Sequence, residues 1–287
     1  MRERISPYIA LMKLRVVELL LVTTLPALFL AHGGIPSLKI TVATLIGGTL
    51  AAGASNAFNM IIEVDSDRLM NRTSKRPLVT GQVSEQAAFI FASAITIISL
   101  AIFKIFTNTY ATFLTAAAIV FYVLGYTIGL KRRTSQNIVW GGIAGCMPVL
   151  IGWAAIRDSL SLTAWLFFLV IFFWTPPHFW ALAIKYKDDY AAAGIPMLPV
   201  VATMKSVEKQ MWWHTIGMIV TSLGVNYTAH LPWWCWVITA LLGGGFITQL
   251  VRINKGDGAK AAAKLFQWSI TYLSAFSLIL VIAVLVK

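Results

Sequence analysis

Residues 161–182 read SLTAWLFFLVIFFWTPPHFWAL and contain no Asp, Glu, Lys or Arg. A helix that crosses a bilayer needs roughly 20 mainly apolar residues, so this stretch predicts a transmembrane helix. Eight further mainly apolar stretches occur at 14–31, 40–61, 86–104, 110–129, 138–155, 211–229, 233–251 and 266–286. The sequence therefore predicts an all-α polytopic membrane protein with nine transmembrane helices in a single domain over residues 1–287.

The composition of the whole chain also indicates a membrane protein. Hydrophobic residues make up 58% of the sequence and charged residues 12%, with a mean hydropathy of +0.77. Soluble domains carry about 25% charged residues, so a soluble fold could not bury this much apolar surface. The net charge of +12 would suggest nucleic acid in a soluble protein. Here the basic residues lie in short runs between apolar stretches, which indicates loops beside anionic membrane lipid and no nucleic-acid partner.

The Lys and Arg residues are distributed very unevenly between the two sides of the predicted bundle. Of the 23 in the chain, only four lie on one side, namely Lys39, Lys104, Arg157 and Lys287. Loops rich in Lys and Arg stay in the cytoplasm. We therefore expect a cytoplasmic N-terminus, a periplasmic or extracellular C-terminus, and a multi-pass location in the bacterial plasma (inner) membrane.

The first chemically rich cytoplasmic loop follows the second apolar stretch. Asn59, Glu63 and Asp67 have i, i+4, i+8 spacing, so they share one face if the helix continues past the membrane. Two carboxylates and an amide oxygen suit Mg²⁺, which bridges to substrate phosphates and keeps several waters. These three residues are candidate metal ligands and catalytic residues.

A run of basic residues follows this acidic face directly: Arg68, Arg72, Lys75 and Arg76. Cations beside metal-binding carboxylates are typical of a diphosphate site. The alternative is a solvated helix end with local ion pairs. A further basic run at 131–133 is predicted on the same side of the membrane, where it is a topology signal or helps to bind a diphosphate.

The second rich loop follows the WTPPH string at residues 174–178. Its two prolines remove backbone donors and predict a disturbed, kinked helix. Beyond them, the spacing predicts one helical stripe that runs from the membrane to the cytoplasmic rim: His178, Leu182, Lys185 and Asp189. An ionisable residue inside a span is a functional candidate. The alternatives are a packing histidine and, at the rim, a surface ion pair.

Both rich loops are predicted at the same membrane face. A substrate with a diphosphate head and a long apolar tail would fit there, with the head at the charged loops and the tail between helices. A transporter would instead place ionisable residues near the bilayer midplane. Nearly all acidic residues of this chain lie at the cytoplasmic rim, which favours an enzyme.

These motifs resemble those of the UbiA-type intramembrane prenyltransferases. The resemblance rests on Asn59-x3-Glu63-x3-Asp67 with the following RPL at 76–78, and on the strings LKRRT at 130–134, TPPHFW at 175–180 and GIPMLP at 194–199. The later strings are typical of the branch that farnesylates heme. Two departures stand out: the family usually has Asp where this chain has Glu63, and the second loop reads KYKDD at 185–189 where many relatives have a second Asp-x-x-x-Asp motif.

The resemblance implies a bundle of nine helices around a central cavity, with Mg²⁺ as the cofactor. It implies transfer of the farnesyl group of farnesyl diphosphate to a vinyl group of heme B, which gives heme O. Neighbouring heme-biosynthesis or terminal-oxidase assembly proteins would be further partners. An open alternative within the family is a prenyltransferase for an aromatic quinone precursor.

The resemblance also implies roles for residues outside the first acidic face. Lys185 and Asp189 would join the catalytic residues. Further residues would bind the diphosphate: Arg132, Arg133, Lys187 and Asp188. His178 and Trp174 would bind heme, with the neutral imidazole of His178 as an axial ligand of the iron.

Overall fold

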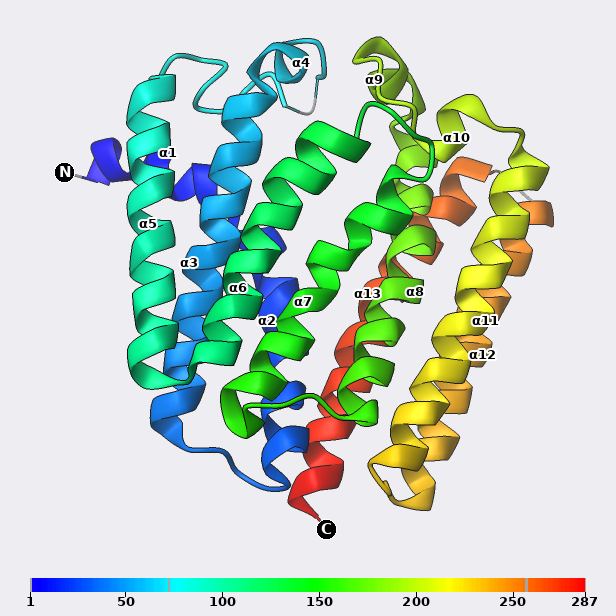
Figure 1. The fold of residues 1–287 in the computed structure, drawn as a ribbon. Helices are drawn as coiled ribbons and strands as arrows, with labels where there is room; N and C mark the ends of the chain where they lie inside the picture. The colour runs from blue at the N-terminus through cyan, green and yellow to red at the C-terminus, as the bar shows by residue number, and fades with distance from the viewer. Residues whose placement is uncertain (1, 72, 256–257, 287) are drawn as a thin grey trace.

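The computed structural model describes residues 2–71, 73–255 and 258–286, and every regular element in these residues is helical. Figure 1 shows a bundle of long helices with short helices over one end. The long helices are α2 (Leu14–His32), α3 (Leu38–Ile62), α5 (Glu85–Phe106), α6 (Thr109–Val120) with its π-helical continuation η1 (Phe121–Leu130), α7 (Asn137–Arg157), α8 (Leu162–Lys185), α11 (Met204–Thr228), α12 (Trp233–Lys255) and α13 (Gly258–Leu285). The short helices are α1 (Arg2–Met12), α4 (Val64–Arg68), α9 (Lys187–Ala192) and α10 (Leu198–Val201).

Seven helical spans in the described residues are long and apolar enough to cross a membrane: α3, α5, α6 with η1, α7, α8, α12 and α13. α1 and α2 meet at a bend of 57° and together make an eighth candidate. α11 packs in the same bundle against α8 and α12, although its Trp, His and Asn side chains lower its hydropathy (Figure 1). Each predicted apolar stretch corresponds to one of these helices, so the prediction of an all-α polytopic membrane fold is confirmed.

Local sequence signals explain several helix starts. Ser84, Asn108 and Ser161 precede α5, α6 and α8, and each side chain accepts a hydrogen bond from a backbone N–H three residues later, at 3.2, 2.8 and 3.3 Å. Such caps satisfy donors that the first helical turn leaves unpaired. The prolines at 176–177 do not break α8, which continues as one helix to Lys185. Neighbouring helices and polar side chains compensate for missing donors inside a membrane bundle.

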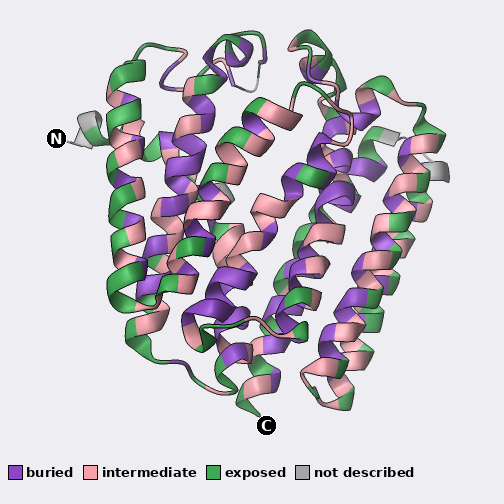
Figure 2. Ribbon diagram, in the orientation of Figure 1, coloured by how far each residue is buried: buried purple, intermediate pink, exposed green. Residues whose placement is uncertain are grey.

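Burial in the bundle is directed inward. Figure 2 shows buried residues concentrated on the inner faces, and α7 and α8 at the centre have the largest buried shares. Large apolar side chains such as Ile97 on α5 and Leu241 on α12 are exposed on the outside, as expected for a surface that faces lipid. The loops that contain α4, α9 and α10 gather at one end of the bundle, opposite the C-terminus (Figure 1). This arrangement brings the two charged loops together.

Candidate active site

A cavity of about 350 Å³ lies between the helices beneath these loops. Its walls come mainly from α2, α3, η1, α7 and α8, and most of its lining is apolar. One end is polar and is lined by six side chains that we call the charged pole: Lys13, Asn59, Glu63, Asp67, Arg76 and Lys131. The shape and lining therefore suit an amphipathic molecule with a charged head.

The acidic face predicted from the sequence lies in the charged pole. α3 ends at Ile62 and α4 begins at Val64, yet the i to i−4 hydrogen bonding continues across the junction. The N–H of Glu63 donates to the carbonyl of Asn59 at 3.1 Å, and the N–H of Asp67 donates to that of Glu63 at 2.8 Å. As the spacing predicts, all three side chains line the same cavity, and their exposed fractions are only 2–3%.

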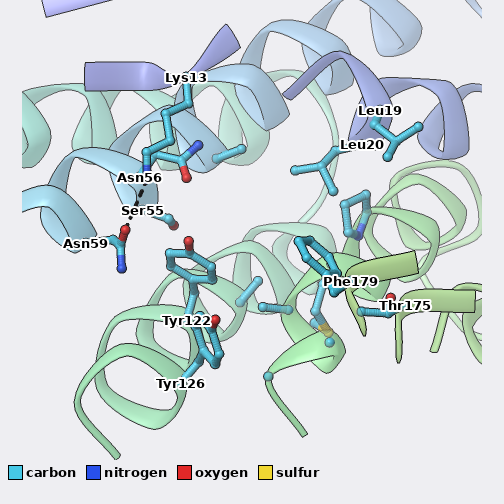
Figure 3. Close-up of a pocket in the computed structure, with 18 of the residues that line it drawn as sticks. Lys13, Leu19, Leu20, Ser55, Asn56, Asn59, Tyr122, Tyr126, Thr175 and Phe179 are labelled. Atoms are coloured by element: carbon cyan, nitrogen blue, oxygen red, sulfur yellow. Dashed lines mark hydrogen bonds between the residues drawn. The ribbon is translucent and has the colours of Figure 1, made fainter. Parts of the chain in front are cut away.

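A basic side chain contacts each member of this face. Lys131 Nζ lies 2.5 Å from Oε1 and 2.6 Å from Oε2 of Glu63. An Arg76 Nη1 nitrogen forms an ion pair with Asp67 Oδ2. Lys13 Nζ donates to Asn59 Oδ1 at 3.1 Å, the contact drawn as a dashed line in Figure 3. With three basic side chains beside only two carboxylates and one amide, the pole is rich in hydrogen-bond donors and suits a polyanion.

Lys13 reaches the pole because the chain bends between α1 and α2. Its backbone is left-handed, with φ 51°. Two contacts fix the bend: Asn56 Nδ2 donates to the carbonyl of Met12 at 3.0 Å, and Gly53 leaves room for the Met12 side chain, whose Cε would lie 2.6 Å from an added Cβ. A non-glycine residue in this conformation is held by its surroundings and occurs at functional sites more often than elsewhere.

The π-helix η1 brings Lys131 and two tyrosines to the cavity. The N–H of Lys131 donates to the carbonyl of Tyr126 at 2.9 Å, a spacing of five residues that continues the π-helical pattern. Gly141 on α7 is required here, because an added Cβ would lie 2.1 Å from Tyr126 Cδ2. Figure 3 shows the rings of Tyr122 and Tyr126 on the same side of the cavity as Asn59, across from Phe179. π-helical segments are rare in proteins, and those that occur often lie at functional sites.

The sequence pattern does not predict Lys13 at the site, and it predicts Lys131 there only as part of the basic run 131–133, which is a topology signal or helps to bind a diphosphate. The signal that could have identified them is their position at the cytoplasmic end of an apolar stretch, where a side chain can reach inward. The assigned neighbours Arg132 and Arg133 are exposed and do not line the cavity.

Of the residues in the basic run that the structure describes, one lines the cavity. Arg76 lines it, whereas Lys75 is exposed and Arg68 pairs with the exposed Asp65 at 3.1 Å. Arg72 lies outside the described residues.

The oxygen atoms of the charged pole can provide part of the coordination of a metal ion, with the other ligands supplied by water and a phosphate. In the described part of the chain, no group of three or more His, Cys, Asp or Glu side chains could hold a metal ion. Two carboxylates and one amide remain as oxygen donors, from Glu63, Asp67 and Asn59. Mg²⁺ needs six oxygens and usually takes several from waters and substrate phosphates, so this partial donor set fits Mg²⁺ that arrives with a diphosphate.

The second loop is placed differently from the prediction. α8 ends at Lys185, the backbone breaks at Tyr186 with φ −110° and ψ 32°, and α9 then begins. Of the four residues in the predicted stripe, only Leu182 lines the cavity, and the break separates Asp189 from the other three. Lys185, Lys187 and Asp188 are exposed and do not line the cavity. The cavity lining from this loop consists instead of three other residues: Tyr190, Ile195 and Met197.

Asp189 connects the two loops. Its Oδ1 accepts a hydrogen bond from Asn71 Nδ2 at 3.2 Å, across 118 positions of sequence. The side chain of Asp189 is half-buried and does not line the cavity. This contact links the two loops without adding a carboxylate to the charged pole.

His178 is buried in a packed cluster and does not line the cavity. Its ring stacks between Trp174 and Phe266, with centroid distances of 4.2 and 4.5 Å, and its Nδ1 lies 2.6 Å from Ser269 Oγ. These contacts favour the packing alternative. Trp174 does line the cavity, and its Nε1 donates to the carbonyl of Ser269 at 2.7 Å.

Comparison with known proteins identifies the family. A model described as the UbiA prenyltransferase family matches residues 20–271. The chain is 47% identical over 281 residues to a protein from Streptomyces avermitilis named protoheme IX farnesyltransferase, and the match covers 94% of this chain and 91% of that one. It is 45% identical over 290 residues to a protein of the same name from Frankia casuarinae, with both chains fully covered.

Solved structures share the fold at much lower sequence identity. The structure of digeranylgeranylglyceryl phosphate synthase matches with a TM-score of 0.82 and 15% identity, over 99% of this chain and 100% of that chain. A UbiA homolog from Archaeoglobus fulgidus bound to DMAPP and Mg²⁺ matches with a TM-score of 0.72 and 19% identity, over 96% of this chain and 98% of that chain. These likenesses concern the arrangement of the helices.

Proposed function

Because the chain belongs to the UbiA prenyltransferase family and is a prenyltransferase, we propose that it transfers the farnesyl group of farnesyl diphosphate to a vinyl group of heme B. The product is heme O, which carries a hydroxyethylfarnesyl side chain. The observation that carries the proposal is a cavity with a charged pole and an apolar body, in a chain 45–47% identical, along nearly its whole length, to proteins named for this reaction. The homolog with bound DMAPP and Mg²⁺ supports a prenyl diphosphate as the donor substrate and a metal as the cofactor.

The charged pole binds the diphosphate in this proposal. Asn59, Glu63 and Asp67 would hold Mg²⁺, which would supply positive charge beside the leaving diphosphate. Lys131 and Arg76 contact the phosphate oxygens, for which they exchange their present carboxylate partners. These cations stabilise the negative charge that grows on the diphosphate as the bond to the allylic carbon breaks.

The apolar body of the cavity protects the reactive carbon. Loss of diphosphate leaves an allylic cation, which water would capture in an open site. The aromatic rings of Tyr122 and Tyr126 line the cavity on the side of Asn59, with Phe179 across from them (Figure 3), and aromatic rings stabilise a nearby cation. The vinyl carbon of the acceptor bonds to the allylic carbon. Water then adds to the new cation beside the porphyrin and loses a proton.

The exposed basic residues around the pole act at longer range. This rim set consists of Arg68, Lys75, Arg132, Arg133, Lys185 and Lys187. Their charges raise the local concentration of an anionic substrate rather than contact it. Asp188 and Asp189 moderate this positive field, and Asp189 also holds the loops together through Asn71.

The same proposal places the charged pole at the cytoplasmic face. It follows from the concentration of Lys and Arg on that side of the sequence, with the N-terminus in the cytoplasm, the C-terminus outside and the protein in the bacterial plasma membrane. Substrate with a diphosphate head then reaches the pole from the cytoplasmic leaflet.

Incubation of the purified protein with farnesyl diphosphate, heme B and Mg²⁺ tests this function. Mass spectrometry of the extracted porphyrin should show heme O, and chelation of Mg²⁺ should prevent its formation. A parallel reaction with an aromatic quinone precursor tests the other acceptor class. Prenylation of the aromatic compound without any farnesylated porphyrin would contradict the proposal.

A further inference from the structure

The end of the cavity opposite the charged pole is closed. Thr44 from α3 and Phe103 from α5 line this end, with exposed fractions of 1% and 0%. At a rise of 1.5 Å per residue, Thr44 and Asn59 are separated by about 22 Å along α3. The cavity therefore has a defined depth measured from the pole.

One wall of the cavity leads from the pole to this closed end. Apart from Asn56, which lies beside the pole, the residues of α3 that line the cavity below the pole are small: Thr44, Gly48, Ala51, Ala52 and Ser55. A Cβ added at Gly48 would meet no heavy atom within 4 Å, so the space beside it is open. This wall forms a smooth channel for an extended, unbranched or lightly branched apolar chain.

Phe103 is held rigidly at the bottom of the channel. A Cβ added at Gly47 would lie 2.8 Å from Phe103 Cε2, so the ring packs directly on the backbone of α3. At the same level, Ser99 Oγ donates to the carbonyl of Gly47 at 2.7 Å and fixes α5 against α3. Because both the ring and its helix are fixed, Phe103 forms a firm stop instead of a movable side chain.

The geometry points to Phe103 as the residue that sets the maximum length of the prenyl chain, an inference that rests on the proposed function. The diphosphate lies at a pole built on α3, so the attached chain starts beside α3 and continues down its channel. The depth of about 22 Å accommodates a diphosphate and an extended farnesyl chain. The opposite wall, with Trp174 and Phe179, is left for the acceptor.

Two substitutions should change the length preference in opposite directions. Phe103→Ala removes the stop and opens space for one more isoprene unit. Gly48→Leu places a side chain one helical turn above Thr44, about 6 Å closer to the pole, and shortens the channel by about one unit. Ile105→Ala is the matched control, because Ile105 lies on the same helix with its side chain exposed.

The test measures binding of the thiolodiphosphate analogues of geranyl, farnesyl and geranylgeranyl diphosphate, with Mg²⁺, by calorimetry. Phe103→Ala should improve the affinity for the geranylgeranyl analogue relative to the farnesyl analogue by about tenfold or more. Gly48→Leu should weaken the affinity for the farnesyl analogue by a similar factor and leave the affinity for the geranyl analogue unchanged. Ile105→Ala should keep the parent order.

The outcomes separate this inference from the proposed function. If the parent protein binds none of the analogues, the proposed prenyl transfer is wrong. If the parent protein binds them and both variants keep its order of affinities, Phe103 is not the stop. If Phe103→Ala fails to fold, Gly48→Leu decides alone, because it leaves the Phe103 contacts in place. An unchanged affinity of Gly48→Leu for the farnesyl analogue would then overturn the inference.

Discussion

Residues 59–76 and residues 174–190 form two charged regions at the same end of the bundle, and they differ in where their charged side chains lie. In the first region, Glu63 and Asp67 are buried and paired with Lys131 and Arg76. In the second region the charged side chains lie mostly at the surface, and the residues that reach the cavity are uncharged, namely Thr175 and several aromatic or apolar side chains. Sequence composition alone makes the two regions look alike.

The difference shows what distinguishes a binding site from a charged rim. A buried carboxylate is unfavourable unless a cation compensates it, so buried pairs inside a cavity indicate charges kept for a ligand. Exposed charges are screened by water and salt and contribute little individually. We therefore assign binding and catalysis to the first region, and assign substrate attraction and packing to the second.

The largest expected effect comes from Asp67→Ala. It removes a candidate metal ligand and leaves Arg76 without its carboxylate partner. Farnesyl transfer should fall by about 10²–10³-fold, with the protein still folded in detergent. The matched change in the second region, Asp188→Ala, should alter transfer by less than about threefold. Equal losses in the two variants would remove the distinction between the regions.

Lys131→Met should have the next largest effect. The substitution leaves Glu63 buried without a cation, which should destabilise the protein by about 3 kcal/mol and lower transfer by about a hundredfold. Thermal unfolding in detergent and product assays measure the two losses. The double variant Glu63→Gln/Lys131→Met should recover stability and stay inactive. Recovery of activity in the double variant would mean that the pair is only structural.

His178→Ala tests the inner end of the second region. Loss of the stacked ring between Trp174 and Phe266 should destabilise the protein by about 2–4 kcal/mol. The Soret band of bound heme should keep its position, because His178 does not line the cavity. A shifted Soret band would show that His178 is an axial ligand, and heme binding would then be assigned to the second region.

The smallest effect is expected from Lys185→Ala combined with Lys187→Ala at the rim. Both side chains are exposed, so their loss should raise KM for farnesyl diphosphate a few-fold at low salt and leave kcat unchanged. The difference should disappear at high salt, where exposed charges are screened. A lower kcat that persists in high salt would place these lysines in contact with the substrate.

The sequence predicts the fold and the acidic face well, for different physical reasons. Long apolar stretches have few alternatives to membrane helices, so the spans follow from composition. Asn59, Glu63 and Asp67 lie on one short helical segment, where spacing alone fixes a common face.

The partners of that face depend on features the sequence pattern does not show. Lys13 and Lys131 arrive from other helices through a left-handed residue and a π-helix. At the second loop, the predicted stripe requires a continuous helix to Asp189, but α8 ends at Lys185 and the break at Tyr186 places Asp189 on a separate helix, α9. Tertiary packing determines such breaks, and periodicity gives no warning of them.

Binding of Mn²⁺ as a stand-in for Mg²⁺ tests the central claim most directly. Electron paramagnetic resonance can count the Mn²⁺ bound in the presence of the farnesyl thiolodiphosphate analogue. It would be applied to the parent protein, to Asp67→Asn and to Asp188→Asn, which are matched changes of one carboxylate to an amide. We predict that the parent and Asp188→Asn bind Mn²⁺ with the analogue and that Asp67→Asn does not. Parent-like Mn²⁺ binding in Asp67→Asn, or its loss in Asp188→Asn, would contradict the assignment of the diphosphate site to residues 59–76.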